Sequence, residues 1–160
     1  MDQNTTSAEN IHQLLTSMGY IAIPFRQNVA GQLLINAKIN EVDGVYILDT
    51  GAGQTVIDTK QADTLKLKLN HEETALTGGG VGAHSMENMP SYNNKIEINN
   101  FKIDNLLVAV MSLETGWESL AQVGAHDKLY GIIGVDILKT GNAIIDFSRM
   151  TLYLKQPAAE

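Results

Sequence analysis

The centre of this chain is the run Val45-Tyr46-Ile47-Leu48-Asp49-Thr50-Gly51-Ala52-Gly53-Gln54-Thr55-Val56-Ile57. Its first four residues are apolar, which is typical of a buried strand, and they lead directly into Asp49-Thr50-Gly51. An aspartate at the end of such a strand, on a turn of small residues, is poorly hydrated. Its carboxylate faces any molecule that lies over the turn. We interpret Asp49 as catalytic, and the alternative is an aspartate that only caps the turn.

The small residues Thr50 and Gly51 would let two such loops approach each other, as two carboxylates that share a proton must do. The Asp-Thr-Gly motif occurs once in the sequence. A pair of these carboxylates therefore requires a second copy of the chain, related by a two-fold axis.

The composition is that of an ordinary globular protein. With 160 residues, 44% of them apolar and 18% charged, the chain is expected to form a single domain, residues 1–160. The formal net charge is -7, and no window combines Lys and Arg with aromatic residues, so nucleic acid is not an expected partner. The absence of cysteine excludes disulfides, thiolate catalysis and cysteine-ligated zinc.

The sequence predicts no membrane span and no signal peptide. No apolar run approaches the ~20 residues that cross a bilayer. Residues 1–6 contain neither a basic region nor an apolar one. The compartment stays open between the cytoplasm and, if a signal peptide has been removed, the periplasm.

A helix is predicted over residues 8–18, ending at Gly19. Its large apolar residues follow the i, i+3, i+4, i+7 pattern and form one stripe, Ile11, Leu14, Leu15 and Met18. We expect this stripe to dock on the rest of the protein. A pro-segment or a dimer-contact helix is the alternative.

After this helix the pattern is mostly β. The expected strands are residues 20–26, 32–39, 45–48, 55–57, 71–77, 85–98, 105–112, 131–134, 143–147 and 151–154. Asp43-Gly44 is expected to form a hairpin turn, and a short helix is expected at 59–67 with Asp58 as its N-cap. Residues 113–130 have no clean period and are expected to form a long loop, and residues 135–139 one helical turn.

Three segments, in this order, resemble the retropepsin-like aspartic proteases, the single-domain relatives of pepsin. Residues 46–57 resemble the catalytic loop with its flanking strands. The glycine-rich segment 78–82 has the position of the family's flap. Residues 131–147 resemble its apolar strand, short helix and closing strand, and the whole resemblance covers roughly residues 32–154.

The resemblance, which is nearest to bacterial single-domain members, implies a mostly β fold with two or three short helices. The fold would be a closed β-barrel, the half-domain of acid proteases. Residues 1–19 would be an N-terminal helical extension and residues 20–154 the β body.

The resemblance also implies an aspartic endopeptidase that acts as a homodimer on an extended peptide, without a cofactor. Asp49 from each subunit would be catalytic. Thr50 would bond across the axis, Gly51 would allow the close approach, and Ala52 would support the loop. The flap over the substrate would comprise Gly79, Gly80, Val81 and Gly82.

Other residues have competing interpretations. Asp136 could supply a second carboxylate, but no Thr-Gly follows it, and a structural hydrogen-bonding role is expected for it and for Asp146. The glycines at 78–82 could form a simple flexible loop. A phosphate-binding loop fits poorly, since neither a P-loop lysine nor a following helix is present.

No metal site is expected, because the histidines have no ligand spacing. They are His12, His71, His84 and His126. Trp117 either lines a substrate cleft or packs the long loop onto the body. Two other functions stay open: a catalytically silent dimerisation or peptide-binding module of the same fold, and a monomer with an unpaired, inert Asp49.

Overall fold

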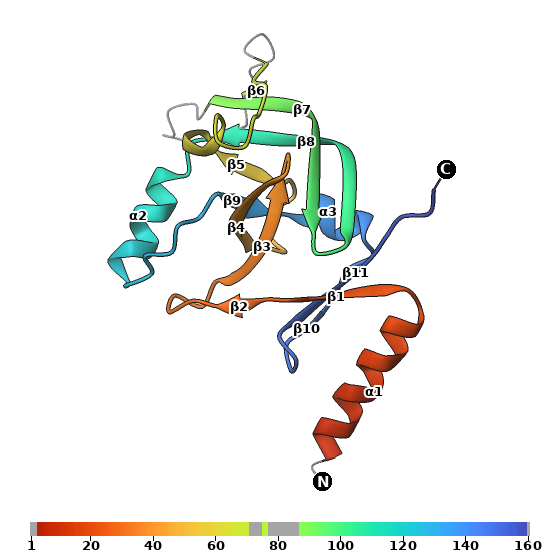
Figure 1. Ribbon diagram of the computed structural model, residues 1–160. Helices are drawn as coiled ribbons and strands as arrows, with labels where there is room; N and C mark the ends of the chain where they lie inside the picture. The colour runs from red at the N-terminus through yellow and green to blue at the C-terminus, as the bar shows by residue number, and fades with distance from the viewer. Residues whose placement is uncertain (1–2, 71–74, 77–86, 160) are drawn as a thin grey trace.

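The computed structural model describes residues 3–70, 75–76 and 87–159 (Figure 1). The helices of this part are α1 (Gln3–Ser17), α2 (Glu114–Gln122), α3 (Val135–Thr140) and the 3-10 helix η1 (Thr59–Gln61). The strands are β1 (Tyr20–Pro24), β2 (Arg26–Gln27), β3 (Leu33–Ile39), β4 (Val42–Leu48), β5 (Val56–Asp58), β6 (Ala75–Leu76), β7 (Glu87–Ile98), β8 (Phe101–Met111), β9 (Gly131–Ile133), β10 (Ile144–Asp146) and β11 (Thr151–Lys155). The predicted mostly β fold with a few short helices is confirmed.

The larger sheet closes on itself into a barrel. Its strand order is β2-β3-β4-β9-β5-β8-β7-β6, and an additional pairing of β3 with β7 joins six strands into a ring. Closure pairs the edges that an open sheet would leave exposed. The ring encloses the main core, to which Ile39, Ile57 and Phe101 contribute fully buried side chains.

Strand β9 connects two distant parts of the chain. It lies between β4, to which it is parallel, and β5, to which it is antiparallel. The register Leu48↔Ile133 brings the end of β4 beside the end of β9. As a result, the loop that follows β4 and the helix α3 that follows β9 begin at the same place.

A second, three-stranded sheet has the order β1-β11-β10. Along β11 the side chains alternate, as in any strand. Leu152 and Leu154 join the main core. Tyr153 points to the other face, where its hydroxyl lies 2.8 Å from Nδ1 of His12 in α1.

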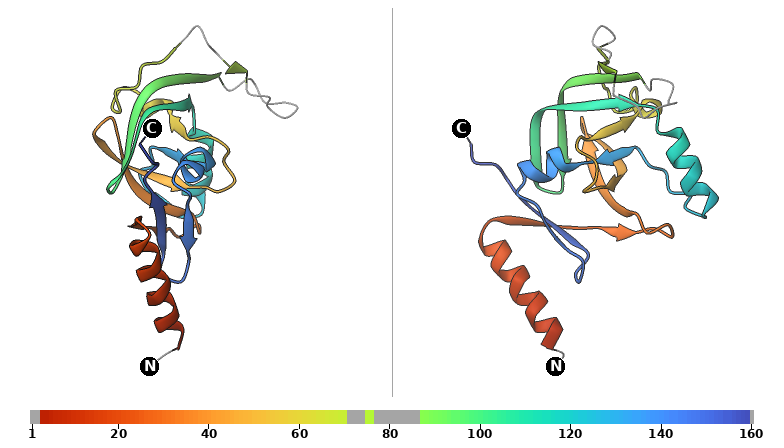
Figure 2. Two further views of the ribbon diagram at one scale, coloured as in Figure 1. Left: turned by 90° about the vertical axis from the view of Figure 1, so that its right-hand side faces the viewer. Right: turned by 180° about the vertical axis from the view of Figure 1, so that it is seen from behind.

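Helix α1 projects away from the barrel (Figures 1 and 2). Of its predicted stripe, Leu15 is buried with 7% of its surface exposed, whereas Ile11, Leu14 and Met18 are 49%, 59% and 50% exposed. The expectation that the whole stripe docks is therefore wrong. The helix meets the sheet through the side that carries His12 and Leu15, so most of the stripe faces sideways into solvent.

The hairpin turn predicted at Asp43-Gly44 is also wrong. The turn lies at Asn40 and Glu41, whose φ angles are 49° and 72°, and Gly44 is paired with Ala37 inside β4. A Cβ atom on Gly44 would lie 2.6 Å from the ring of Tyr130. The glycine therefore serves close packing within a strand rather than a turn.

The long loop expected at 113–130 contains helix α2. Trp117 and Leu120 of this helix pack against a small cluster formed by Leu34, Ile47 and Leu129. Tertiary packing thus supplies the helical stability that the local pattern does not reveal. Within the described ranges, each helix is too short or too polar to cross a membrane.

Candidate active site

The Asp49 loop is tied to the end of β9 by backbone hydrogen bonds. The Asp49 amide donates to the carbonyl of Ile133 at 3.0 Å, which extends the β4–β9 ladder by one residue. The Val135 amide, at the start of α3, donates to the carbonyl of Ala52 at 2.7 Å. The loop is therefore held at Asp49 and at Ala52 by the same strand–helix unit.

The Asp49 side chain lies half-buried between the barrel and the surface. Its Oδ1 accepts a hydrogen bond from the Gly51 amide at 2.8 Å. Within the described part of the chain, Oδ2 has no protein partner. Thr50 and Gly51 are exposed at the tip of the loop. The carboxylate is thus fixed by one oxygen and can accept or share a proton at the other.

A second set of hydrogen bonds fixes the far end of the loop at Thr55, whose side chain is fully buried. The Thr55 amide and hydroxyl donate to the two carboxylate oxygens of Asp136, at 3.0 and 2.8 Å. The same hydroxyl accepts from the Gly134 amide at 3.1 Å. Paired bonds of this kind to a carboxylate are strong and directional. We call this group the Thr55 clamp, comprising Thr55, Gly134 and Asp136.

The Asp49 loop leaves no room for a side chain at Gly134. A Cβ atom there would lie 2.6 Å from the carbonyl oxygen of Ala52 and 2.8 Å from that of Gln54. These are backbone atoms, so a larger residue would have to displace the loop itself. Thr55 and Gly134 are not among the site residues predicted from the sequence, although both stand within the segments that carry the resemblance.

The other candidate carboxylates have structural roles, as predicted. Both oxygens of Asp136 are occupied by Thr55. Asp146 Oδ1 accepts from the amide and hydroxyl of Ser148, at 2.9 and 2.6 Å. The Ser148 hydroxyl, followed by the Arg149 and Ser148 amides, holds the pKa of Asp146 below its ordinary value. Asp146 Oδ2 has no hydrogen-bond partner in the described residues, but it is buried, whereas the Asp49 side chain is only half-buried beside the exposed Thr50 and Gly51.

Trp117 packs α2 onto the body, as one of its two interpretations predicts. Its indole Nε1 donates to Oδ2 of Asp58 at 2.8 Å. Asp58 is 2% exposed and its Oδ1 also accepts from the Lys60 amide, so the predicted N-cap is confirmed. Ala62 and Leu65, which follow this cap, are buried, at 4% and 0% exposure.

Two further groups of candidate residues lie outside the part of the chain that the structure describes. The predicted flap residues, Gly79, Gly80, Val81 and Gly82, lie outside the described residues. So do His71 and His84. Within the described ranges, no three histidine or carboxylate side chains cluster as a metal site requires.

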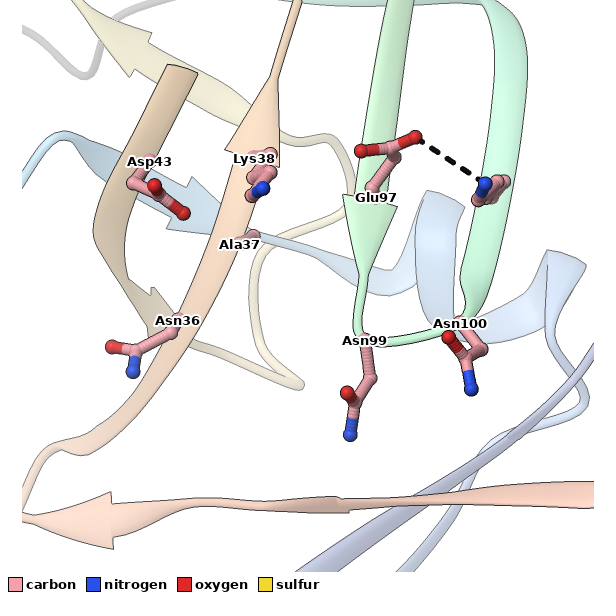
Figure 3. Close-up of a pocket in the computed structure, with 8 residues that line it drawn as sticks. Asn36, Ala37, Lys38, Asp43, Glu97, Asn99 and Asn100 are labelled. Carbon is pink, nitrogen blue, oxygen red and sulfur yellow. Dashed lines mark ion pairs between the residues drawn. The ribbon is translucent and has the colours of Figure 1, made fainter. Parts of the chain in front are cut away.

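A polar hollow of about 370 Å³ lies between the β3–β4 and β7–β8 hairpins, and Figure 3 shows the side chains that line it. Glu97 and Lys102 form an ion pair in it at 3.7 Å. Asp43, on the opposite wall, stands near the start of β4, whereas Asp49 follows the end of that strand. The hollow therefore lies away from the Asp49 loop, and we assign it no part in the site.

A closed barrel with an Asp-Thr-Gly loop fixed beside a strand–helix unit is the architecture of the retropepsin-like aspartic proteases. A retropepsin-like aspartic protease from Rickettsia conorii shares the fold, with a TM-score of 0.54 and 22% identity over 88% of this chain and 94% of that one. The retroviral protease-like domain of Ddi1 from Leishmania major gives a TM-score of 0.53 and 19% identity, over 77% and 87%.

The sequence model of the aspartyl protease family matches residues 35–137. The chain therefore belongs to this family, and the resemblance inferred from the sequence is confirmed. No curated protein sequence matches the chain.

Proposed function

We propose that the chain is an aspartic endopeptidase, active as a homodimer in which each subunit supplies one Asp49. The observation that carries this proposal is the state of the Asp49 carboxylate. One of its oxygens is held by the Gly51 amide, and the other has no partner in the described part of the chain. Family membership supports the same chemistry.

The proposed reaction uses a water molecule and two carboxylates that share one proton. Two carboxyl groups ~3 Å apart cannot both ionise, because their negative charges would repel each other. One Asp49 is therefore protonated and its partner is ionised. The ionised carboxylate removes a proton from the water, whose oxygen attacks the peptide carbonyl, while the protonated carboxylate donates to the carbonyl oxygen. The C–N bond then breaks as the nitrogen takes the proton that the first carboxylate received from the water, while the second carboxylate removes a hydroxyl proton from the intermediate and so restores the shared proton. No covalent intermediate forms.

The residues around Asp49 have supporting roles in this proposal. Thr50 is exposed at the loop tip, where its hydroxyl can bond across the axis. Gly51 fixes the carboxylate through its amide, and the Ala52 carbonyl anchors the loop to α3. The segment Gly79–Gly82 would close over an extended peptide, whose backbone pairs with flap and floor as an added strand.

Cleavage of a mixed peptide library at acidic and neutral pH tests the proposal. We expect endoproteolytic products that increase with time and disappear when a statine-type peptide is added, because its hydroxyl replaces the attacking water. Peptide binding without products would instead identify a catalytically silent binding module. The same library incubated with the Asp49→Asn variant controls for contaminating proteases.

A further inference from the structure

The barrel face from which Asp49 projects continues as an apolar surface beyond the catalytic loop. Side chains alternate along a strand. In β4, Leu48 belongs to the main core and Ile47 to a separate cluster on the other face. Asp49 extends the ladder of β4 by one residue, so its side chain lies on the face of Ile47. Two residues of a strand span ~7 Å, and one substrate side chain can bridge that distance.

The neighbouring strands widen this surface into a floor. Ile132 of β9 is paired with Ile47 of β4 and with Val56 of β5, and paired residues lie on the same face of a sheet. Ile47 is 5% exposed, whereas Ile132 and Val56 are half-buried. We call these three side chains the aliphatic floor. It lies one row from Asp49, and a substrate can reach it at Ile132 and Val56.

Helix α2 stands at one side of the barrel (Figure 1) and borders this floor. Its residues Leu120 and Trp117 pack against the cluster that includes Ile47 and Ile132. The Trp117 indole donates to Asp58 at 2.8 Å, and Asp58 is 2% exposed, so a buried carboxylate holds the helix in place. Leu120 is half-buried, and its remaining surface can contact a side chain that lies on the floor.

We propose that α2 forms a wall of the substrate groove, and that Leu120 limits the size of the substrate side chain beside the cleaved bond. The inference rests on the proposed function, because it requires a peptide that lies over Asp49. Floor and wall are aliphatic, so a charged substrate side chain would lose its hydration without gaining a partner. Because α2 already covers most of Ile47, the open floor takes an aliphatic side chain such as leucine. An aromatic ring would collide with Leu120.

The proposed dimer would repeat this wall on the other side of the cleaved bond. A two-fold axis beside Asp49 sets the two α2 helices at equal distances from the axis. The size limit should therefore apply at two substrate positions that are equally far from the cleaved bond. A limit on one side alone would contradict a symmetric pair of walls.

The simpler interpretation is that Leu120 only packs α2 onto the body. A substitution would then change the fraction of folded enzyme, and the cleavage of every substrate would change by the same factor. A size limit instead changes the ratio of kcat/KM between two substrates, and that ratio does not depend on the folded fraction. The test therefore measures ratios, with the residue made both smaller and larger.

Paired peptides supply these ratios. Peptides that the wild-type chain cuts are synthesised with alanine, leucine or phenylalanine beside the cleaved bond. Leu120→Ala should raise kcat/KM for phenylalanine relative to leucine at least ~10-fold, because each methylene of space in an apolar pocket is worth about that factor or more. Leu120→Phe should lower kcat/KM for leucine relative to alanine by a similar factor. Val123→Ala, at a side chain that is 64% exposed directly after α2, is the matched control and should change neither ratio.

Trp117 gives a second measurement, which does not depend on cleavage. It is the only tryptophan in the sequence, and it packs in the same cluster as Leu120. Its fluorescence should therefore change when a peptide lies on the floor. The probes are two tryptophan-free octapeptides with a central Leu-Leu or Ser-Ser pair, added to the Asp49→Asn chain. We expect a saturable change that needs at least ~10-fold less of the Leu-Leu peptide.

The outcomes separate this inference from the proposed function. A saturable fluorescence change with the Leu-Leu peptide, in a chain whose wild type cuts no peptide, would support the groove beside α2 and contradict the protease. Cleavage by the wild type, with ratios that both Leu120 variants leave unchanged, would overturn the wall alone. A chain that neither binds nor cuts these peptides would overturn both. Circular dichroism checks that each variant folds.

Discussion

Asp49 and Asp136 follow two strands of the same parallel pair, but their surroundings differ. Asp49 comes directly after β4, accepts from its own loop at one oxygen, and has no described partner at the other. Asp136 stands in the first turn of α3 after β9, and Thr55 occupies both of its oxygens. The comparison teaches that a carboxylate with both oxygens satisfied holds structure, as at Asp136. An oxygen without a described partner allows chemistry only where it is also accessible, as at Asp49 and not at Asp146, whose Oδ2 is buried.

The largest expected effect is the loss of peptide cleavage when Asp49 is replaced, and this loss distinguishes Asp49 from Asp136. Asp49→Asn keeps the shape of the side chain but cannot share a proton in the required way. We expect kcat/KM to fall at least ~100-fold, the lower range for the loss of an acid–base group. The unfolding free energy should stay unchanged or rise, because one source of like-charge repulsion in the dimer is gone.

Peptide-cleavage kinetics and urea unfolding of the same preparation measure these two quantities. A variant that cuts at close to the wild-type rate would remove Asp49 from the mechanism. Loss of folding together with activity would instead give Asp49 the structural role that we assign to Asp136.

The second expected effect is on the unfolding free energy, and it tests whether the Thr55 clamp stabilises the fold. Thr55→Val removes the hydroxyl and leaves the buried Gly134 amide and one part-buried Asp136 oxygen without that partner. We expect the unfolding free energy to fall by about 1 to 3 kcal/mol. Thr55→Ser keeps the hydroxyl and is the matched control. Destabilisation by serine together with a valine variant as stable as the wild type would show that the methyl group, which valine keeps, matters and the clamp does not.

The smallest expected effect concerns α2, which lies away from both carboxylates. Trp117→Phe removes the donor to Asp58, and we expect a loss of about 1 to 2 kcal/mol, since Asp58 keeps its bond to the Lys60 amide. Activity per folded molecule should not change. A double-mutant cycle with Asp58→Asn isolates the pair. Additive effects of the two substitutions would contradict the bond as the source of the loss.

The sequence was most informative where one motif and its strand decide the local geometry. Asp49 after β4, Asp58 as a cap and the helical turn after β9 all depend on neighbours in the chain. The Thr55 clamp joins residues about 80 positions apart, through a strand order in which β9 enters between β4 and β5. No local pattern encodes such a contact.

The wrong predictions have a similar cause. Gly44 was interpreted as a turn residue because its need for close packing arises from Tyr130, a residue of another segment. Helix α2 was missed because Trp117 and Leu120 gain their stability from the body rather than from a local period. The apolar stripe predicted the helix α1 correctly. It did not reveal which side of that helix packs against the three-stranded sheet.

Mixing two kinds of chain tests most directly whether the active unit needs an Asp49 from each of two copies. Wild-type and Asp49→Asn chains are combined in equal amounts, above the dimer dissociation constant, and peptide cleavage is measured at constant total concentration. Random pairing predicts that about one quarter of the wild-type activity remains, because only that share of dimers has two intact carboxylates. Retention of about one half would mean that each chain acts alone, and would contradict the shared site.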